Sequence, residues 1–484
     1  MKKLTDILKN TPVRELCGDT AAAIGGLVYD SRAVKPGDCF FAVPGTQSDG
    51  HDYIPIAVEK GAAAIVCERM PADAAEGVAY VLVGDSAEAM ADMAAAFYDY
   101  PSRELKLVGI TGTNGKTTTA TLLYDLVRAM GYKAGLISTV VYKIDGREVE
   151  ATHTTPDSIR LNAMMREMAD AGCAYCFMEC SSHAIVQERT RGLDFAGGIF
   201  SNITHDHLDY HKTFAEYIRA KKLFFDGLPK GAFALTNADD RNGRVMVQNT
   251  AAAVSAYSLR AMADFRCKIV EMHLDGMLLR IDGQELWVGL LGRFNAYNLL
   301  AVYGAAALLG LDRGEVLRVL SMLHAVSGRF EKIRAANGTT AIVDYAHTPD
   351  ALENVIQTIE EIRTPGQQLI VVCGCGGDRD RTKRPEMAAI AVKYATMAVF
   401  TSDNPRHESP EAILDDMVAG LEPGARYLRI ADRAEAIRTA VMLSRPGDII
   451  LVAGKGHETY QIVGDVKHPF DDREEIKKRF ALLN

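Results

Sequence analysis

The chain has 484 residues, 48% of them hydrophobic and 24% charged, a balance typical of a soluble globular protein. This length is enough for about three domains of ordinary size. The net charge of −9 argues against broad binding of nucleic acid or anionic membranes. The sequence shows no signal peptide and no apolar stretch long enough to cross a bilayer, and its nine scattered cysteines indicate reduced thiols. We therefore expect a cytoplasmic protein with no nucleic-acid or membrane partner.

The first hundred residues carry short strand and helix patterns. Residues 37–43 form an apolar strand pattern that ends at Pro44-Gly45, and an alanine-rich helix pattern covers about residues 87–98. Tyr100-Pro101-Ser102 is typical of a domain boundary. The sequence therefore predicts a smaller α/β domain over residues 1–100.

A regular alternation of strands and helices follows, and it predicts a parallel sheet with right-handed crossovers. A helix pattern covers residues 116–130 and ends at Gly131. We assign residues 101–327 to this central domain. The apolar strands are expected over residues 105–110, 134–138, 175–180, 198–203 and 233–236.

Three cysteines in this region, Cys173, Cys176 and Cys180, are close enough to suggest a zinc site. The alternation through residues 174–180 instead favours one buried strand with side chains on both faces.

A second alternating pattern begins after Gly328-Arg329 and predicts a doubly wound, Rossmann-like domain over residues 328–484. In such a domain, ligands bind at the carboxyl ends of the strands. The strands are expected over residues 340–345, 368–373, 398–402 and 448–453, and helices over 351–362, 386–394 and 434–442.

Residues 111–118, Thr-Gly-Thr-Asn-Gly-Lys-Thr-Thr, join an apolar strand to a helix. The glycines let backbone N–H groups surround phosphate oxygens, and the helix N-terminus adds positive potential. Lys116 can reach the terminal phosphates and Thr117 can bind magnesium. Strict Walker spacing would require glycine at Ile110, so this is a variant loop. It predicts a site for a nucleoside triphosphate.

This loop resembles the ATP loop of the Mur ligases and of their folylpolyglutamate synthetase relatives, and further matches cover nearly the whole chain. The resemblance implies a three-domain ligase with a P-loop ATPase domain at its centre, which uses ATP and Mg²⁺ to form an amide through an acyl phosphate. The residues that it implies for ATP binding are Gly112, Thr113, Asn114, Gly115, Lys116, Thr117, Thr118, Asn298, Arg329, Asp344 and His347.

Acidic and imidazole side chains follow the strands next to the loop. Read alone, the segment from His205 to His211 could be the metal site of a hydrolase, and that alternative stays open. The resemblance instead implies that Glu179 and His207 bind Mg²⁺ together with Thr117. It also implies that Lys221 is the lysine that relatives carry as a carbamate formed with carbon dioxide. Lys116, Glu179, His207 and Lys221 are thus the expected catalytic residues.

The resemblance further implies that the acceptor substrate is UDP-MurNAc-L-Ala-D-Glu. Hydroxyl, amide and guanidinium groups suit its pyrophosphate and carboxylates. The expected contacts are Ser31, Thr46, Gln47 and Ser48 in the first domain, and Thr154, Thr155, Ser181, Gln187 and Arg189 in the second.

The last domain concentrates charged residues at three strand ends. Arginine binds a carboxylate in two-point geometry, and Glu458 can bind an ammonium, so the set suits an amino acid with both groups at its far end. The Asp-Asn-Pro-Arg segment also resembles the recognition motif of diaminopimelate-adding ligases. The residues expected to bind meso-diaminopimelate are Arg379, Asp403, Asn404, Pro405, Arg406, Gly454 and Glu458.

We expect the chain to be monomeric. Three alternatives remain at this point: a lysine-adding ligase, a metal-dependent hydrolase, and a nucleotide-binding regulator without catalysis.

Overall fold

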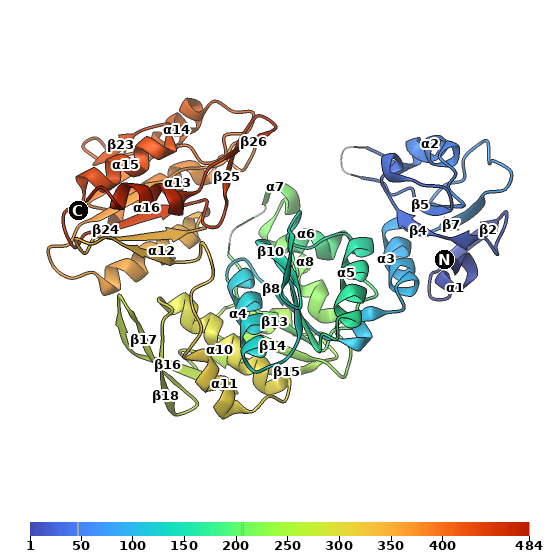
Figure 1. Ribbon diagram of the computed structural model, residues 1–484, viewed down its shortest axis with the longest axis horizontal. Coiled ribbons are helices and arrows are strands. Elements are labelled where there is room, and N and C mark those ends of the chain that lie inside the picture. Colours follow the sequence, from blue (N-terminus) through green and yellow to red (C-terminus); the bar gives the residue numbers. More distant parts are fainter. Residues whose placement is uncertain (46–47, 205, 207, 484) are drawn as a thin grey trace.

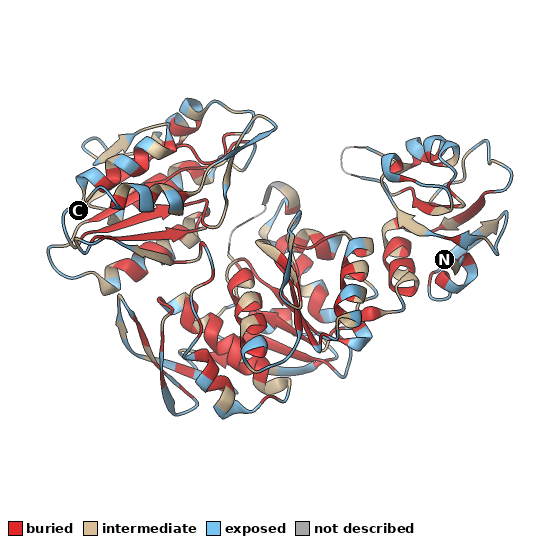
Figure 2. Cartoon of the chain, in the orientation of Figure 1, coloured by how far each residue is buried: buried red, intermediate tan, exposed pale blue. Residues whose placement is uncertain are grey.

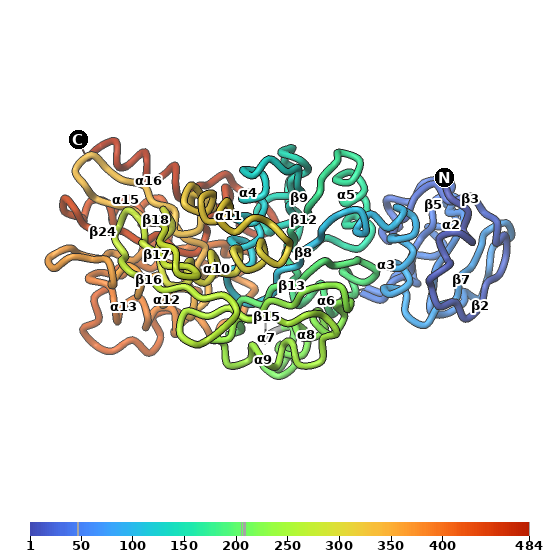
Figure 3. The backbone as a smooth tube through the Cα atoms, turned by 90° about the horizontal axis from the view of Figure 1, so that it is seen from below, coloured from blue at the N-terminus to red at the C-terminus, as the bar shows by residue number. Residues whose placement is uncertain are grey.

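The computed structural model describes residues 1–45, 48–204, 206 and 208–483. The chain folds around three main sheets that follow one another along its longest axis (Figure 1; Figure 3 gives the view from below). Figure 2 shows that the strands of the central and C-terminal sheets are largely buried, whereas the outward faces of the helices are exposed. Within the described residues, no helix is long and apolar enough to cross a membrane.

The first sheet has the strand order β2-β7-β6-β5-β4. Strands β4 to β7 are parallel, and β2 runs antiparallel to β7. The predicted helix at residues 87–98 is α3, which lies between this sheet and α5 of the second domain. The elements are β1 (Lys2–Lys3), α1 (Leu4–Ile7), β2 (Val13–Cys17), β3 (Ala23–Ile24), β4 (Gly26–Val28), β5 (Asp38–Phe41), α2 (Ile54–Glu59), β6 (Ala64–Cys67), β7 (Ala79–Val83) and α3 (Ser86–Phe97).

The central sheet has the order β11-β10-β9-β12-β8-β13-β14-β15-β16-β17-β18. Strands β9, β12, β8, β13, β14, β15 and β16 are parallel, so every strand predicted for this domain is present and the predicted parallel sheet is confirmed. The strands are β8 (Lys106–Thr111), β9 (Ala134–Ile137), β10 (Val141–Ile144), β11 (Arg147–Glu150), β12 (Tyr175–Glu179), β13 (Gly197–Phe200), β14 (Phe233–Asn237), β15 (Ala253–Ser258), β16 (Phe265–His273), β17 (Gly276–Ile281) and β18 (Gln284–Val288).

Helices cover both faces of this sheet. One core packs under α4, α10 and α11, and the other packs under α5 and α8. Strand β12 supplies both cores in alternation: Tyr175 and Phe177 face the first, and Cys176 and Met178 face the second. The prediction of a buried strand at the cysteines is therefore confirmed. The helices are α4 (Lys116–Ala129), α5 (Ser158–Asp170), α6 (Ser182–Val186), α7 (Leu208–His211), α8 (Phe214–Asp226), α9 (Gly243–Met246), α10 (Arg293–Leu308) and α11 (Arg313–Leu320).

Both edges of the central sheet end in antiparallel hairpins, which we did not predict. Strands β10 and β11 form one edge, and β16, β17 and β18 form the other. Asp145-Gly146 and Asp282-Gly283 join the strands, with positive φ at both residues of each pair. Two consecutive positive φ values define the type I′ turn, which matches the twist of a hairpin.

The C-terminal sheet has the order β19-β20-β24-β21-β22-β23, and all its strands are parallel except β19. Helices α12, α13 and α14 cover one face, and α15 and α16 cover the other, which confirms the predicted doubly wound domain. The elements are β19 (Glu331–Arg334), β20 (Thr340–Asp344), α12 (Pro349–Ile362), β21 (Leu369–Cys373), α13 (Lys383–Tyr394), β22 (Met397–Phe400), α14 (Pro410–Val418), β23 (Tyr427–Arg429), α15 (Arg433–Leu443), β24 (Ile449–Ala453), the hairpin β25 (Tyr460–Val463) and β26 (Val466–Pro469), and α16 (Asp472–Phe480).

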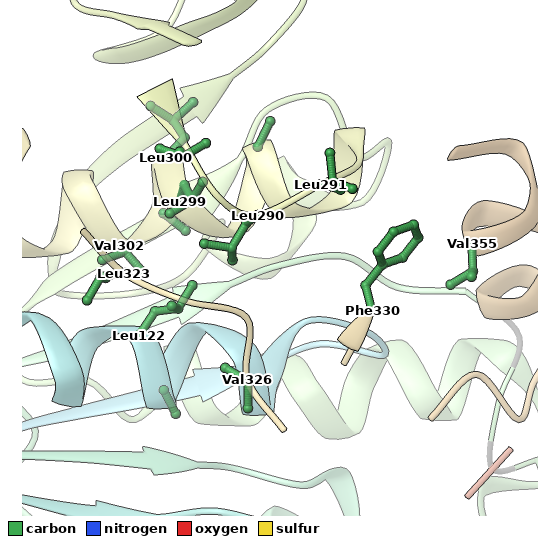
Figure 4. Packing of buried hydrophobic residues seen from close by; sticks show 14 of the residues in the cluster. Leu122, Leu290, Leu291, Leu299, Leu300, Val302, Leu323, Val326, Phe330 and Val355 are labelled. Atoms are coloured by element: carbon green, nitrogen blue, oxygen red, sulfur yellow. The ribbon is translucent and has the colours of Figure 1, made fainter. Parts of the chain in front are cut away.

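The joint between the second and third domains is apolar. Phe330, just after the predicted boundary, packs with its ring 5.9 Å from that of Phe294 in α10. Figure 4 shows Phe330 between Leu291 of the central domain and Val355 of α12. One hydrophobic core thus continues from α4 and α10 into the C-terminal domain.

Candidate active site

The loop between β8 and α4 can be built only with glycine at two positions. Gly112 has φ 150° and Gly115 has φ 88°. A Cβ on Gly112 would lie 2.0 Å from Ser201 Oγ, and a Cβ on Gly115 would lie 2.5 Å from Asn298 Oδ1. The backbone therefore packs tightly behind the loop, and this fixes the direction of its N–H groups at the start of α4.

Two lysine ammonium groups meet at one carbonyl of this loop. Lys116 Nζ donates to Gly112 O at 2.9 Å and to Thr113 O at 2.7 Å. Lys221 Nζ, on the buried face of α8, donates to the same Gly112 O at 2.7 Å. Burial holds the pKa of Lys221 well below its usual range, and the charge of Lys116 lowers it further. Burial also lowers the pKa of Lys116, although Glu179 opposes that shift.

Glu179 ends β12, directly beside the phosphate-binding loop. The parallel pairing places it opposite Ile110 of β8. Its carboxylate is almost completely buried and accepts hydrogen bonds from Thr139 N at 2.7 Å and Thr139 Oγ1 at 3.1 Å. A fixed, buried carboxylate next to a phosphate-binding loop is suited to holding a divalent cation.

The C-terminal domain reaches into the same region with a guanidinium. Arg329 Nη2 donates to Thr117 Oγ1 at 3.2 Å, and its guanidinium lies 4.6 Å from the centroid of the Tyr345 ring. Asp344 accepts hydrogen bonds from Phe330 N at 2.7 Å and Ala346 N at 2.8 Å, which fixes the segment around it.

Two further residues of that domain face the loop. His347 Nδ1 is 2.8 Å from Tyr345 O, and the residue lines the cavity. Asp350, in the first turn of α12, accepts hydrogen bonds from Asn114 Nδ2 at 2.9 Å and Thr204 Oγ1 at 3.3 Å. The third domain is thus hydrogen-bonded to the loop at more than one point.

A cavity of about 500 Å³ opens between the two domains. Gly112 supplies a carbonyl to the lysines but is not among the lining residues, and His207 lies outside the described residues. The predicted residues that line the cavity are Thr113, Asn114, Gly115, Lys116, Thr117, Thr118, Thr154, Glu179, Ser181, Lys221, Asn298, Arg329, Asp344 and His347.

The predicted acceptor contacts of the central domain form one group beside this cavity. Arg189 Nη1 donates to Thr155 O at 2.7 Å, and Arg189 Nη2 donates to Gln187 Oε1 at 2.7 Å. Thr155 Oγ1 donates to the backbone carbonyl of Glu179 at 2.7 Å, which ties the group to the end of β12. Ser181 caps α6, as its oxygen accepts from Ala184 N at 3.2 Å.

The predicted contacts that the structure describes in the first domain do not line the cavity. Ser31 is buried and Ser48 is exposed, and neither lines the cavity, while Thr46 and Gln47 lie outside the described residues. Tyr29, two residues before Ser31, is within electrostatic range of Arg189: burial raises the pKa of Tyr29, and the Arg189 charge opposes that shift.

The charged residues of the C-terminal strand ends come together. Strands β24, β21 and β22 are neighbours in the sheet. Gly454 and Glu458 follow β24, Arg379 follows β21, and the segment from Asp403 to Arg406 follows β22. Burial lowers the pKa of Arg406, Arg379 lowers it further, and Asp403 and Glu458 oppose this, so these three charges lie within electrostatic range of Arg406. None of them lines the large cavity.

Tyr345 lies near Asp403 and Glu458 of this charged group, which we call the charged pocket, and it also lines the cavity. The tyrosine lines the cavity, and burial raises its pKa, with the charges of Glu458 and Asp403 adding to the shift. Arg406 itself has φ 50° and donates from Nη1 to Gly377 O at 2.8 Å. Asp403 and Glu458 are therefore within electrostatic range of the cavity wall at Tyr345.

Sequence reasoning missed Thr139, Asp350 and Lys455. Thr139 follows β9 and Asp350 follows the N-cap residue Thr348, and neither position carries a motif of its own. Lys455 lies in the Gly-Lys-Gly-His-Glu segment that we singled out, but a lysine in a glycine-rich loop usually suggests a solvated side chain, and this one is buried.

Three family models match successive parts of the chain. They are the Mur ligase family catalytic domain over residues 23–98, the Mur ligase middle domain over residues 110–306, and the Mur ligase glutamate ligase domain over residues 328–456.

Curated relatives are similar along the full chain. A protein from Phocaeicola vulgatus named UDP-N-acetylmuramoyl-L-alanyl-D-glutamate–2,6-diaminopimelate ligase is 55% identical over 481 residues, which cover 99% of both chains. A protein of the same name from Chlorobaculum tepidum is 44% identical and covers 96% of this chain and 94% of its own.

Solved structures agree in fold. A ligase structure of that name is 31% identical with a TM-score of 0.71, covering 100% of this chain and 99% of its own. The MurF ligase from Thermotoga maritima in complex with ADP is 19% identical with a TM-score of 0.63, covering 94% and 96%, which is a likeness of fold. With family models matching from residue 23 to residue 456, and more than half its residues identical to those of a full-length relative, this chain belongs to the Mur ligase family.

Proposed function

We propose that this chain is the ATP-dependent ligase that adds meso-diaminopimelate to UDP-MurNAc-L-Ala-D-Glu in peptidoglycan precursor synthesis. The observation that carries the proposal is the cavity that holds Lys116, Glu179 and Arg329 together, with the charged pocket of Arg406 and Glu458 at the strand ends of the third domain. The identity of 55% over 99% of a relative named as the 2,6-diaminopimelate ligase supports the same reaction.

The reaction must turn a carboxylate, a poor electrophile, into a good one. The side-chain carboxylate of the D-glutamyl residue attacks the γ-phosphorus of ATP, and ADP leaves. The amine of diaminopimelate then attacks the acyl phosphate, the amide bond forms, and inorganic phosphate leaves with the bonding electrons. Lys116 and Arg329 offset the charge of two anions that would otherwise repel each other.

The site also fits Mg²⁺ and a carbamate on Lys221. The fit rests on the buried Glu179 carboxylate beside Thr117 and on the low pKa of Lys221, because carbon dioxide adds only to a neutral amine. Glu179, Thr117, His207 and carbamylated Lys221 would hold the ions. When bound, Mg²⁺ offsets phosphate charge and polarises the γ-phosphoryl group.

Each domain has a proposed part in binding. Residues 1–100 bind the UDP portion, residues 101–327 bind ATP and the sugar–dipeptide, and residues 328–484 bind the amino acid. Thr154 and Ser181 line the cavity region from which the acceptor carboxylate would approach Lys116, and Arg189 is hydrogen-bonded to the neighbouring Thr155. We propose a cytoplasmic enzyme that acts as a monomer.

The charges of the third domain favour meso-diaminopimelate over L-lysine. The far end of diaminopimelate carries a carboxylate and an ammonium, and Arg406 with Arg379 can bind the first while Glu458 binds the second. Lysine has only the ammonium and would leave Arg379 and Arg406 without a substrate carboxylate.

A phosphate-release assay tests the proposal. The enzyme is given ATP, Mg²⁺ and UDP-MurNAc-L-Ala-D-Glu, with meso-diaminopimelate or L-lysine, and the tripeptide product is identified by mass. We expect phosphate and product in equal amounts with diaminopimelate. Preference for lysine would indicate the lysine-adding ligase. Turnover without ATP would indicate a hydrolase, and nucleotide binding without phosphate release would indicate a regulator.

A further inference from the structure

Lys455 lies in the loop after β24, three residues before Glu458, and its side chain is completely buried. A fully buried ammonium is rare in proteins unless it is paired. Lys455 Nζ donates to Glu458 Oε2 at 2.8 Å and to Asn404 Oδ1 at 3.0 Å. The cation is thus bound to two of the residues that we propose as contacts of the amino-acid substrate.

Asn404 completes a closed triangle. Its Nδ2 donates to Glu458 Oε2 at 2.9 Å, and its Oδ1 also accepts from Ile462 N at 2.9 Å. Both hydrogen bonds to Glu458 therefore end on Oε2. Within the part of the chain that the structure describes, Oε1 is then the oxygen left for an incoming ammonium. The Glu458 side chain is 12% exposed, so it remains accessible from the pocket.

Lys455 also sets the charge balance of the pocket. With it, the pocket holds three cations, Arg379, Arg406 and Lys455, against three carboxylates, Asp378, Asp403 and Glu458. Without it, the carboxylates outnumber the cations by one. The nearby Arg433 does not change this balance, because it forms a completely buried ion pair with Asp472.

We propose that Lys455 is a positioning residue that makes the amino-acid pocket reject side chains ending in an ammonium alone. The inference rests on the proposed function. An L-lysine side chain adds an uncompensated cation to a pocket whose charges already balance, whereas the far end of meso-diaminopimelate is neutral overall. Lys455 acts through Glu458: it holds the carboxylate in place and weakens its attraction for an unaccompanied ammonium.

Two substitutions separate the charge from the hydrogen bond. Lys455→Met removes both, and Lys455→Gln removes the charge but keeps a donor for Glu458. The measurement is the ratio of kcat/KM for meso-diaminopimelate to kcat/KM for L-lysine. We expect the ratio to fall by about tenfold or more in both variants, because a like charge close to a bound ammonium has been removed.

The ratio distinguishes selection from loss of folded enzyme. Both substrates are assayed on one preparation, so a smaller active fraction cancels out, and KM for ATP should stay at the wild-type value. Lys467→Met is the matched control. Both lysines lie near the Tyr460 ring, with Nζ of Lys467 at 4.4 Å and Nζ of Lys455 at 5.7 Å from its centroid, but Lys467 is exposed on β26. Its ratio should not change.

An unchanged ratio in both Lys455 variants overturns the inference. It leaves the proposed function intact as long as the wild-type enzyme ligates diaminopimelate. Failure of the wild-type enzyme to form product with diaminopimelate overturns the proposed function itself. Should neither variant turn over, thermal shifts with each amino acid replace the ratio. The inference is supported if L-lysine raises the melting temperature of the variants, relative to the rise with diaminopimelate, by more than it does in the wild-type enzyme. No such increase counts against the inference.

Discussion

At the scale of single residues, the site depends on charges placed where water cannot screen them. Lys116 and Lys221 meet at the Gly112 carbonyl, and both have lowered pKa values because they are buried. Two ammonium groups at one oxygen repel each other. Conversion of Lys221 into an anionic carbamate would turn that repulsion into attraction.

The carbamate can be observed directly. Protein equilibrated with ¹³C-labelled bicarbonate should show a carbamate carbon signal by NMR at neutral pH. Lys221→Ala should abolish the signal and reduce ligase activity by about a hundredfold or more, because an anionic ligand is lost. Lys222→Ala is the control, since Lys222 is the next residue and pairs with Asp226 on the surface. Equal signals from both variants would place the carbamate elsewhere.

His457 gives a prediction for stability against pH. Burial, followed by the charge of Arg329, lowers its pKa from 6.5 to about 3. Between these values the unfolded chain binds a proton that the folded chain does not, so stability falls as pH drops through that window. His457→Gln should remove up to about 3 kcal/mol of this loss, measured from denaturant unfolding at pH 7 and pH 4. The exposed His468→Gln should keep the wild-type slope, and a His457 variant that also kept it would contradict the assignment.

At the scale of elements, the joint of β8 and α4 is the most demanding part of the fold. Gly112→Ala would force a Cβ to 2.0 Å from Ser201 Oγ in a backbone that L residues rarely adopt. We expect ATP affinity to fall by about tenfold or more, because the N–H groups of the loop would turn away from the phosphates.

Gly131→Ala, at the other end of α4, is the matched substitution, since Gly131 has φ 88° but open space around it. It should cost about 1 kcal/mol of stability and leave ATP affinity unchanged. Calorimetric titration with ATP measures the affinity of both variants. Normal affinity in Gly112→Ala would show that the loop geometry is not needed.

Elements with a strong period were predicted from the sequence, whereas the edge hairpins were missed. Strands such as β12 and β21 are apolar on both faces, which leaves few other arrangements for them. The strands β16 to β18 are half-exposed, and their alternation is weak apart from the Asp282-Gly283 turn signal. That dipeptide was sufficient to predict the hairpin, and we did not use it.

The residues of the site were also predicted where the pattern of strands placed them, and were missed where it did not. Residues at the ends of predicted strands, such as Glu179 and Arg406, could be grouped because the carboxyl ends of parallel strands share an edge. Asp350 and Lys455 could not, because their roles depend on a contact between domains and on complete burial. Neither property is encoded within a short segment of sequence.

At the scale of the whole molecule, Asp350 connects the third domain to the phosphate-binding loop through Asn114 and Thr204. The same domain delivers Arg329 to Thr117. We expect Asp350→Ala to loosen this closure, admit water to the acyl phosphate and lower kcat about tenfold. The diagnostic measurement is phosphate released per amide formed, which should rise from about one to several.

Glu386→Ala provides the comparison for that experiment, because Glu386 is an exposed carboxylate in the first turn of α13 of the same domain. It should keep a ratio near one. A general loss of folded enzyme lowers phosphate and amide together and leaves the ratio unchanged, so a constant ratio in Asp350→Ala would show that the contact plays no part in closure.

The shared core around Phe330 has a consequence for how the protein melts and how it can be divided. Because Phe294, Phe330 and Val355 pack in one apolar body, the second and third domains should lose structure in a single calorimetric transition. A fragment ending at residue 327 would uncover that body and aggregate. The nucleotide-binding module of this ligase is therefore not expected to survive excision from its C-terminal neighbour, however complete its own sheet is.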